Sequence, residues 1–311
     1  MNEDKERVII IGSGSAGLTA AIYSSRAGLN PLVLTGIQPG GQLTITTDVE
    51  NYPGFKNVVQ GPWLMEQMQS QAENVGARIE YDLLTSIETD TWPFQVKTDS
   101  GREIRAETII IATGAQARWL GLKSEEQYNG KGVSACATCD GFFFKDKNVA
   151  VIGGGNTAVE EALYLSNLCK KVTLIHRRDK LRAEKLLQER LFKKENVEIL
   201  WDKCVEEVLG DELGVNGLNL KSTLDNKISK INIEGMFVAI GHDPSTRVFK
   251  NKIKLDSDNY IITNQGGTST SVPGIFAAGD CVDKIYRQAV TAAGMGCMAA
   301  LDAEKWLASK N

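Results

Sequence analysis

The sequence predicts an α/β protein made of two doubly wound units, and three features of the chain carry this prediction. A strand–turn–helix pattern with closely spaced glycines begins near residue 8, and a second copy begins near residue 148. Each copy is closed by a further apolar strand, at 108–114 and at 236–241. Alternating strands and helices of this kind form parallel sheets whose faces are covered by other elements.

Size, composition and charge fit this architecture. The 311 residues suffice for about two domains of roughly 150 residues each. The net charge of −4 argues against a nucleic-acid partner, because phosphate binding favours a basic face. No apolar run approaches the ~18 residues of a membrane span, so no membrane association is expected. The N-terminus lacks an apolar leader, and we therefore expect a cytoplasmic protein whose thiols stay reduced.

The first unit opens with a dinucleotide-binding pattern. Residues 8–11, VIII, predict a buried strand, and GSGSAG then places Gly12, Gly14 and Gly17 in a GxGxxG arrangement. A helix at 19–28 and a strand at 31–35 should follow. Glycines here permit a tight turn and close approach to a pyrophosphate, and the helix N-terminus presents N–H groups to the phosphates.

The second unit repeats the layout. Residues 148–152, NVAVI, predict a strand, and the following GGGNTA places Gly153, Gly155 and Ala158 in the three key positions. A helix and a strand at 171–175 should follow. Two such units indicate two dinucleotides and a relay between them. The alternative is a pair of glycine-rich turns with only a structural role.

The ends of the second strands distinguish the two nucleotides. In the second unit, His176, Arg177 and Arg178 occupy the place where an NAD site carries an acid, and Arg182 follows. Guanidinium groups bind a 2′-phosphate, and two charge-assisted bonds of roughly 1.5–3 kcal/mol each predict about a hundredfold preference for NADPH over NADH. The alternatives are a solvated charge cluster for the arginines and a capping or packing role for His176.

The first unit lacks that acid. Thr35 and Gly36 stand in its place, and the glycine-rich loop IQPGGQL follows. A late strand, GIFAAGD at 274–280, ends in Gly279 and Asp280, whose carboxylate suits a hydroxyl of a polyol chain. A flavin nucleotide carries such a ribityl chain and would need this second contact region.

Between the two nucleotide patterns lies SACATCDGFFF, residues 134–144. Cys136 and Cys139 could be half of a zinc site, a structural staple or a redox dithiol. Zinc usually needs four ligands, yet no second CxxC is present and the chain has only two histidines, so no metal is expected. In a reducing compartment a disulfide is usually catalytic or redox-sensing.

A series of short motifs runs along the whole chain in this order: GSGSAG, PGGQL, ENYPG, ATG, CATCDGFF, GGGNTAVEEA, HRRD, FVAIGH and FAAGD. In these motifs and their order the chain resembles the bacterial-type low-molecular-weight thioredoxin reductases. This resemblance implies two doubly wound, Rossmann-like nucleotide-binding domains, the second inserted into the first. A discontinuous FAD-binding domain would comprise 1–116 and 247–311, and an NADPH-binding domain carrying the CxxC would comprise 117–246. It further implies a homodimer that reduces thioredoxin.

The resemblance also implies the contact residues. The FAD contacts would be Gly12, Gly14, Gly17, Thr35, Gly36, Ile37, Gln38, Pro39, Gly40, Gly41, Gln42, Asn51, Ala112, Thr113, Gly114, Gly279, Asp280, Arg287, Gln288 and Ala289. The NADPH contacts would be Gly153, Gly155, Asn156, Thr157, His176, Arg177, Arg178 and Arg182.

The catalytic roles are likewise implied by the resemblance. Electrons would pass from NADPH through FAD to a Cys136–Cys139 disulfide. Cys139 would be the thiolate facing the flavin, Cys136 the thiol that attacks the partner disulfide, and Asp140 the acid/base. Asp140 could instead cap a turn. Phe142 and Phe143 could dock thioredoxin or pack in the core.

Three rival functions stay open from the sequence. The chain could reduce a different disulfide carrier, although it lacks the extra N-terminal redoxin module that such enzymes often carry. It could be a dithiol oxidase using oxygen, which would not need the arginine pair at 177–178. It could also be a non-enzymatic sensor that binds FAD and signals through the dithiol.

Overall fold

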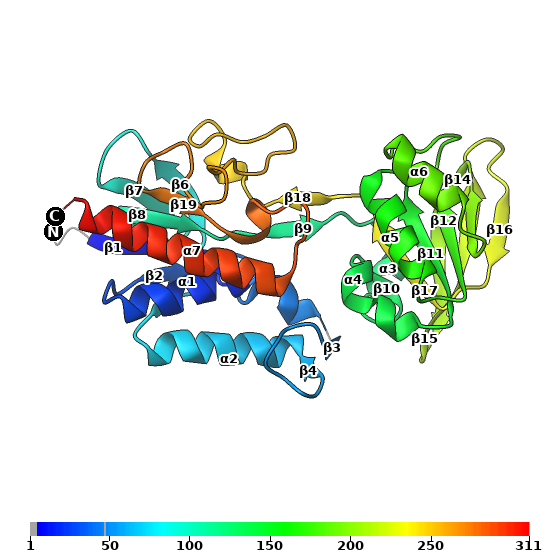
Figure 1. Ribbon diagram of the computed structural model, residues 1–311, viewed down its shortest axis with the longest axis horizontal. Helices are drawn as coiled ribbons and strands as arrows, with labels where there is room; N and C mark the ends of the chain where they lie inside the picture. The colour runs from blue at the N-terminus through cyan, green and yellow to red at the C-terminus, as the bar shows by residue number, and fades with distance from the viewer. Residues whose placement is uncertain (1–4, 47, 311) are drawn as a thin grey trace. The chain divides into compact units, whose positions relative to one another are not determined.

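A computed structural model describes residues 5–46 and 48–310 of the chain. The chain divides into two compact units, unit 1 (Met1–Gln116 and Asp243–Asn311) and unit 2 (Ala117–His242). Unit 2 is therefore one continuous segment inserted between the two parts of unit 1 (Figure 1). Mixed helices and parallel sheets in both confirm the predicted α/β fold class.

Unit 1 is built on a parallel sheet extended by a hairpin. Its strand order is β5-β2-β1-β8-β7-β6, and β19 pairs with β8 as well. The long β8 pairs with β1 and also with two further strands: its residues 103–106 pair with β7, and its residues 109–111 pair with β19. The strands are β1 (Lys5–Ile11), β2 (Leu32–Leu34), β5 (Arg78–Glu80), β6 (Leu84–Glu88), β7 (Phe94–Thr98), β8 (Glu103–Ile111) and β19 (Ile275–Ala277).

Successive residues of β1 show why the sheet is buried on both faces. Val8 and Ile10 belong to the core on the helical side, and Ile9 and Ile11 to the core on the other side. All four are at most 3% exposed. Side chains alternate between the faces of a strand, and each fully buried aliphatic side chain contributes about 1.5–3 kcal/mol. A continuous apolar run is thus the pattern of a strand covered on both sides.

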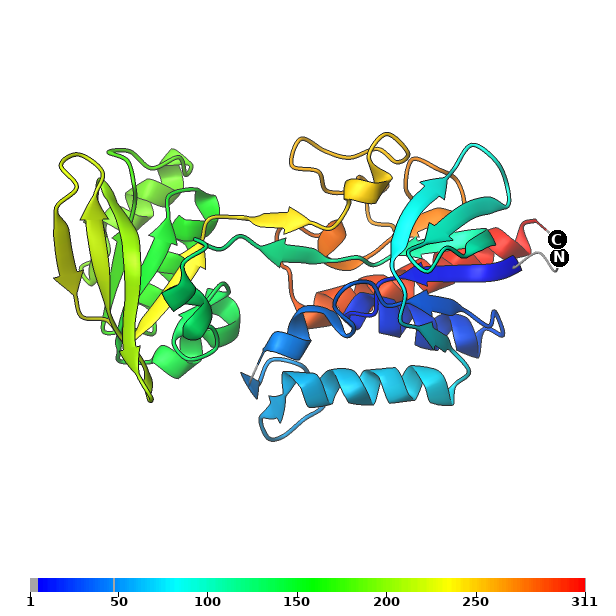
Figure 2. The same cartoon turned by 180° about the vertical axis from the view of Figure 1, so that it is seen from behind.

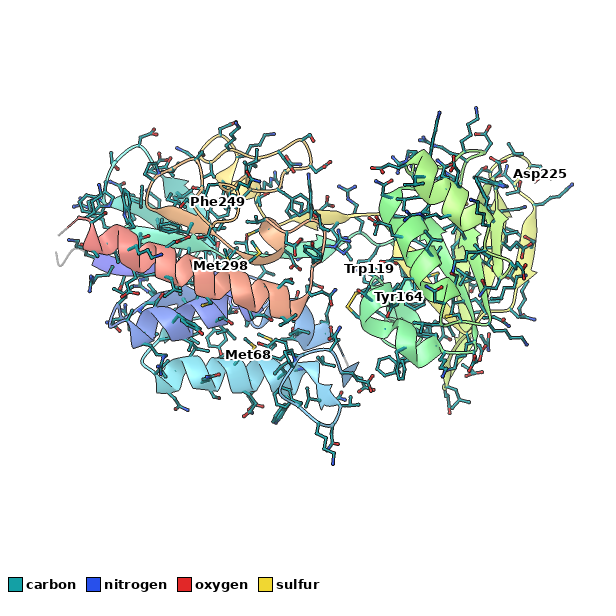
Figure 3. The ribbon with its side chains drawn as sticks, in the orientation of Figure 1. Met68, Trp119, Tyr164, Asp225, Phe249 and Met298 are labelled. Atoms are coloured by element: carbon teal, nitrogen blue, oxygen red, sulfur yellow. A yellow bond between two sulfur atoms is a disulfide. The ribbon has the colours of Figure 1, made fainter. Side chains whose placement is uncertain are left out.

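Three helices cover the first face of the unit 1 sheet: α1 (Ser15–Arg26), α2 (Gly61–Asn74) and α7 (Ala289–Ala308). In Figure 1, α1 lies between α7 and α2. Gly296 lets α7 approach α1 closely, since a Cβ there would lie 2.1 Å from the Ala16 carbonyl oxygen. The core includes Met68 of α2, and Phe249 is buried on the opposite face; both are labelled in Figure 3.

Short elements complete unit 1. The opposite face of its sheet is covered by the β6–β7 hairpin and by the segment around 249–282 rather than by long helices. The short strands are β3 (Asp48–Val49) and β4 (Val59–Gln60), and the 3₁₀ turns are η1 (Gly41–Ile45), η3 (Arg247–Phe249) and η4 (Gly279–Cys281).

Unit 2 repeats the parallel arrangement with order β10-β17-β11-β12-β13. One face is covered mainly by α4, α5 and α6, as the shared core of Ala137, Val159 and Leu191 shows. The strands are β10 (Val133–Ser134), β11 (Asn148–Gly153), β12 (Lys171–Ile175), β13 (Val197–Leu200) and β17 (Gly235–Ala239). The helices and turn are α3 (Lys123–Gln127), α4 (Ala137–Asp140), η2 (Gly141–Phe144), α5 (Asn156–Ser166) and α6 (Lys185–Phe192).

The other face of the unit 2 sheet is covered by a three-stranded antiparallel sheet. It consists of β14 (Lys203–Asp211), β15 (Gly214–Ser222) and β16 (Ile228–Ile231), coloured yellow-green in Figure 2. Val208 and Leu218 of this sheet share a core with Ala150 and Val238 of the parallel sheet. This sheet is not among the elements that the sequence predicts.

The chain passes between the units along two short strands, β9 (Ala115–Ala117) and β18 (His242–Pro244), which pair with each other. Within the described ranges, no helix has the length and apolar character needed to cross a membrane.

Candidate functional site

The two close cysteines of unit 2 form a disulfide at the start of a short helix. Cys136 and Cys139 are bonded, with their Cα atoms 5.3 Å apart. Cys136 is the N-cap of α4, and its sulfur accepts a hydrogen bond of 3.2 Å from the Cys139 N–H. Both residues are half-buried, so the bridge lies near the surface. Disulfides that are accessible in this way are the ones that undergo thiol–disulfide exchange.

The other four cysteines, Cys169, Cys204, Cys281 and Cys297, are free. Burial raises the pKa of the Cys281 thiol to about 11. Burial, with the nearby charge of Asp146, raises that of Cys169 to about 11. Both thiols therefore stay protonated near neutral pH, and a protonated thiol is a poor nucleophile. No cluster of three or more potential metal-ligating side chains occurs in the part of the chain described.

Asp140 ends α4, one residue after Cys139. Its Oδ2 accepts a hydrogen bond of 2.5 Å from the Ser134 hydroxyl, and that hydroxyl oxygen accepts the Cys136 N–H at 3.0 Å. The serine thus links the carboxylate to the backbone of the dithiol turn. Ser134 is not among the predicted site residues, although a serine two residues before a functional turn is a common side chain–backbone motif.

The three phenylalanines after Asp140 divide into two groups. Phe144 is buried and packs edge-to-face on Phe237, with ring centroids 5.3 Å apart. Phe142 is 59% exposed and Phe143 is 36% exposed. Core packing therefore accounts for Phe144 alone, and two aromatic side chains remain on the surface close in sequence to the dithiol.

The first glycine loop, in unit 1, is closely packed against backbone. A Cβ on Gly12 would lie 2.2 Å from the Ala112 carbonyl oxygen, and one on Gly17 would lie 1.9 Å from the Gly12 carbonyl oxygen. Gly14, the N-cap of α1, has open space and no side-chain cap. The loop thus leaves N–H groups of the helix N-terminus available to a phosphate.

Ser13 joins this loop to the second predicted loop of unit 1. Its hydroxyl donates to the Thr35 carbonyl (3.4 Å) and accepts the Gly40 N–H (3.0 Å). Gly41 also lies against Gly14, since a Cβ on Gly41 would be 3.2 Å from the Gly14 Cα. The structure therefore brings the loop at 35–42 beside the first glycine loop. Ser13 was another residue that the sequence analysis missed.

The remaining predicted contacts of unit 1 lie near the start of α7. Asn51 Nδ2 donates to Gln288 Oε1 at 3.4 Å, across 237 positions of sequence. Gln288 caps α7, which begins at Ala289, and Arg287 precedes it with a left-handed φ of 49°. The Asp283 carboxylate holds this turn by accepting N–H groups, including that of Arg287 at 3.1 Å.

Asp280 is a half-buried acidic residue of unit 1 whose pKa is strongly perturbed. Burial and the nearby charge of Asp283 raise the pKa of its carboxyl to about 6, against a lowering influence from Arg287. Among the residues described, none donates a hydrogen bond to this carboxylate. A desolvated acceptor without donors suits a ligand hydroxyl, so the residues present fit a flavin nucleotide with its ribityl chain.

The second glycine loop, in unit 2, is held by a histidine. His176 is 5% exposed; its Nδ1 lies 2.9 Å from the Gly153 carbonyl oxygen and its Nε2 lies 2.9 Å from that of Lys180. Gly154 lies against the ring, since a Cβ there would come within 2.3 Å of it. His176 therefore joins the glycine loop to the basic segment through its two ring nitrogens.

The predicted arginines of unit 2 have the opposite environment. Arg177, Arg178 and Arg182 are exposed, and none forms an ion pair with a described residue. The Arg182 N–H donates to the Gly154 carbonyl at 2.7 Å, which keeps its backbone beside the glycine loop. Glu184 is tied to Asn156, the first residue of α5, by its N–H at 2.9 Å. Three guanidinium groups near a helix N-terminus fit a nucleotide with an additional phosphate.

Gly155 and Thr157 both lie at the start of α5. Gly155, the N-cap of α5, has open space where a Cβ would stand, and no side chain caps the helix. Thr157 is the second residue of the helix and half-buried. Ala112, Thr113, Gly114 and Gly279 belong to unit 1, so the predicted contacts separate by unit into two sets.

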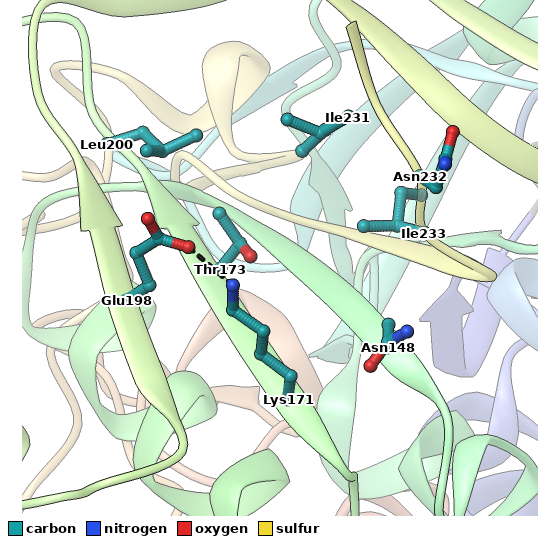
Figure 4. A pocket seen from close by; sticks show the side chains of 8 residues that line it. All are labelled: Asn148, Lys171, Thr173, Glu198, Leu200, Ile231, Asn232 and Ile233. Atoms are coloured by element: carbon teal, nitrogen blue, oxygen red, sulfur yellow. Dashed lines mark ion pairs between the residues drawn. The ribbon is translucent and has the colours of Figure 1, made fainter.

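A pocket of about 310 Å³ lies elsewhere in unit 2 (Figure 4). Its lining includes Asn148 and Lys171, the first residues of β11 and β12, and the Lys171–Glu198 ion pair of 2.6 Å. Ligands of parallel α/β sheets bind at the carboxyl ends of the strands, where the glycine loop lies. The position of this pocket therefore gives it no place in the nucleotide site.

Comparison with known proteins agrees with the geometry. The chain is 59% identical over 303 residues to a protein of Rickettsia conorii named thioredoxin reductase, covering 97% of this chain and 98% of that one. It is 52% identical over 309 residues to the protein of the same name from Escherichia coli O157:H7, covering 97% and 96%. The solved structure of thioredoxin reductase from Giardia duodenalis matches with a TM-score of 0.94 at 44% identity, covering 98% of this chain and all of the other.

The sequence profile of the pyridine nucleotide-disulphide oxidoreductases matches residues 6–296. This match covers nearly the whole chain, and the two glycine loops and the disulfide near the surface agree with it. The chain therefore belongs to the pyridine nucleotide-disulphide oxidoreductase family.

Proposed function

We propose that this protein is an NADPH-dependent flavoenzyme that reduces the disulfide of thioredoxin by way of FAD and the Cys136–Cys139 pair. The observation that carries the proposal is the accessible disulfide within a chain that has two nucleotide loops. Relatives at 52–59% identity that bear the name thioredoxin reductase support it.

The two cofactors are assigned by unit. Unit 1 would hold FAD along its two joined loops and Asp280, and unit 2 would hold NADPH at its glycine loop and its exposed arginines. When bound, the cofactors supply a hydride from the nicotinamide and its passage as an electron pair through the flavin to the disulfide. Ser13 and His176 keep the respective loops in place for this binding.

The reduced dithiol then reduces the substrate. The Cys136 thiolate attacks one sulfur of the thioredoxin disulfide, a mixed disulfide forms, and the other substrate sulfur leaves with the electron pair. Asp140 moves the proton that this leaving sulfur takes up. The Cys139 thiolate next attacks Cys136 Sγ, which releases reduced thioredoxin and re-forms the Cys136–Cys139 bond.

The test is an NADPH-consumption assay coupled to thioredoxin. The protein should be yellow, should be bleached faster by NADPH than by NADH, and should reduce thioredoxin. Cys136→Ser and Cys139→Ser should each lower kcat by about a thousandfold or more, since each removes one sulfur of the exchanging bond. Cys204→Ser is the matched control, because Cys204 is a free, half-buried cysteine of the same unit.

Two results would contradict the proposal. A colourless protein that takes up no flavin would exclude a flavoenzyme. A protein bleached by NADPH that leaves every tested thioredoxin oxidised would favour another disulfide carrier or a sensor function.

We also propose a cytoplasmic homodimer, on the basis of the family resemblance and of cysteine usage suited to a reducing compartment. Sedimentation velocity of the FAD-loaded protein should give twice the mass of one chain. Sedimentation as a single chain at micromolar concentration would exclude the dimer.

A further inference from the structure

We propose that Ser134 is a positioning residue that holds the Asp140 carboxylate beside the dithiol. This inference rests on the proposed function, because it assigns Asp140 the proton transfer described above. The observation behind it is the pair of short hydrogen bonds that connect Ser134 with Asp140 and Cys136.

The direction of these hydrogen bonds follows from the single proton of the serine hydroxyl. Two acceptors lie near that hydroxyl: Asp140 Oδ2 at 2.5 Å and the Cys136 carbonyl oxygen at 3.4 Å. The carboxylate is both nearer and charged, and O–H···O⁻ bonds of 2.5–2.7 Å are the strong ones. The proton therefore lies toward Asp140. The oxygen lone pairs remain free to accept the Cys136 N–H at 3.0 Å.

The serine is itself held firmly. Ser134 is 6% exposed and lies in the edge strand β10, where it pairs with Phe237 of the neighbouring strand β17. Asp140 lies on α4, and its N–H donates to the Cys136 carbonyl at 3.1 Å. One hydroxyl thus connects the sheet of unit 2 to both ends of the CxxC turn. It fixes the carboxylate relative to Cys136, the sulfur assigned to attack the substrate.

This arrangement has a chemical consequence. A hydrogen bond donated to a carboxylate favours its charged form. Removal of the Ser134 hydroxyl would take one such donor from the Asp140 carboxylate. Both the rate of proton transfer and the pH at which it changes should therefore depend on Ser134.

The experiment uses the FAD-loaded protein with NADPH and thioredoxin. Ser134→Ala should lower kcat by about tenfold and move the limb of the kcat–pH profile governed by this carboxyl to higher pH, with an unchanged KM for NADPH. Ser134→Thr keeps a hydroxyl and should restore both. Ser166→Ala is the matched control, since it removes a buried serine hydroxyl that bonds the Leu163 carbonyl at 2.7 Å in the same unit.

A double-mutant cycle separates positioning from a purely structural role. If Ser134 acts through Asp140, Ser134→Ala should have little further effect on kcat in an Asp140→Asn background. An equal loss in both backgrounds would overturn the proposal, as would a Ser134→Ala protein whose kcat and pH profile match the parent.

A second readout does not depend on thioredoxin. In the chemically reduced protein, the pH dependence of Cys136 alkylation by iodoacetamide should shift in Ser134→Ala and return in Ser134→Thr. If the parent protein reduces no thioredoxin, the proposed function fails, while this alkylation profile still decides the role of Ser134. An unshifted profile would exclude it.

Discussion

The two units place the same supersecondary element in different surroundings. Each has an apolar strand, a glycine loop and a helix without a side-chain cap. In unit 1 the charged candidate contacts, Asp280 and Arg287, are half-buried, and a serine joins the glycine loop to a second loop. In unit 2 the charged candidates are the exposed arginines of the basic segment.

This difference corresponds to two kinds of ligand. Half-buried polar groups around two joined loops suit a cofactor that stays bound, because such groups are costly to leave without partners. Exposed guanidinium groups and an accessible disulfide suit molecules that bind and leave in each turnover. The glycine loop therefore indicates a dinucleotide in both units, and its neighbours determine which one and for how long it is held.

Among the variants that test this comparison, the largest effect is expected at the exposed arginines of unit 2. The double variant Arg177→Gln, Arg178→Gln should raise the KM for NADPH by about a hundredfold and leave the KM for NADH nearly unchanged, because only the 2′-phosphate loses its partners. Steady-state kinetics with both nucleotides measure the ratio. Arg190→Gln, an exposed arginine of the same unit, is the control. Equal changes for both nucleotides would show that these arginines do not read the phosphate.

An intermediate effect tests the half-buried side. Asp280→Asn should weaken FAD binding by about tenfold, since a charged acceptor is lost, and flavin titration of the flavin-free protein measures this. In that protein the pKa of Asp280 is raised from 3.8 to about 6. The folded state then prefers the protonated carboxyl, so the stability contributed by this group is full below pH 3.8 and is lost as pH rises through about 6.

It follows that the asparagine variant should unfold at a higher temperature than the parent above pH 6 when both lack flavin. The free energy of unfolding of the two proteins should differ by at most ~3 kcal/mol above pH 6, and this difference should vanish near pH 4. A variant that is less stable than the parent at pH 7.5 would show that the charged carboxylate has a stabilising partner.

The smallest expected effect concerns the exposed aromatic side chains after the dithiol. Phe142→Ala and Phe143→Ala should each raise the KM for thioredoxin by about three- to tenfold. Each substitution removes apolar area from a docking surface, and the lost area would contribute about 1 kcal/mol of binding free energy. Phe192→Ala is a matched control, since Phe192 of the same unit is also 59% exposed. An unchanged KM for thioredoxin in both variants would rule out the docking role.

Much of the fold could be predicted because both repeated units have strong local signals. Apolar runs such as residues 8–11 and 149–152 are buried, and each is followed directly by glycines that the turn requires. The antiparallel sheet at 203–231 has no such marker. Its apolar alternation is interrupted by register shifts, as between Val205 and Glu207, so the pattern along the chain alone is weak.

The candidate site shows the same division. The cysteine pair and the basic segment stand out because their residues are close together in sequence. The contacts of Ser13 with Gly40 and of His176 with Gly153 join residues 27 and 23 positions apart, and a polar residue at such a distance has no pattern by which to find its partner. Packing also determines the surroundings of His176: its buried ring lies against two carbonyl groups, whereas its neighbour Arg177 is exposed.

The insertion of unit 2 into unit 1 also orders events during synthesis on the ribosome. Unit 2 has its entire sequence once His242 has emerged. Unit 1 by then still lacks β19, which pairs with β8, and α7, which packs closely on α1. Synthesis of unit 1 therefore begins first and ends last, whereas unit 2 can already fold. The apolar strands of unit 1 stay incompletely covered until residues 243–311 have been made.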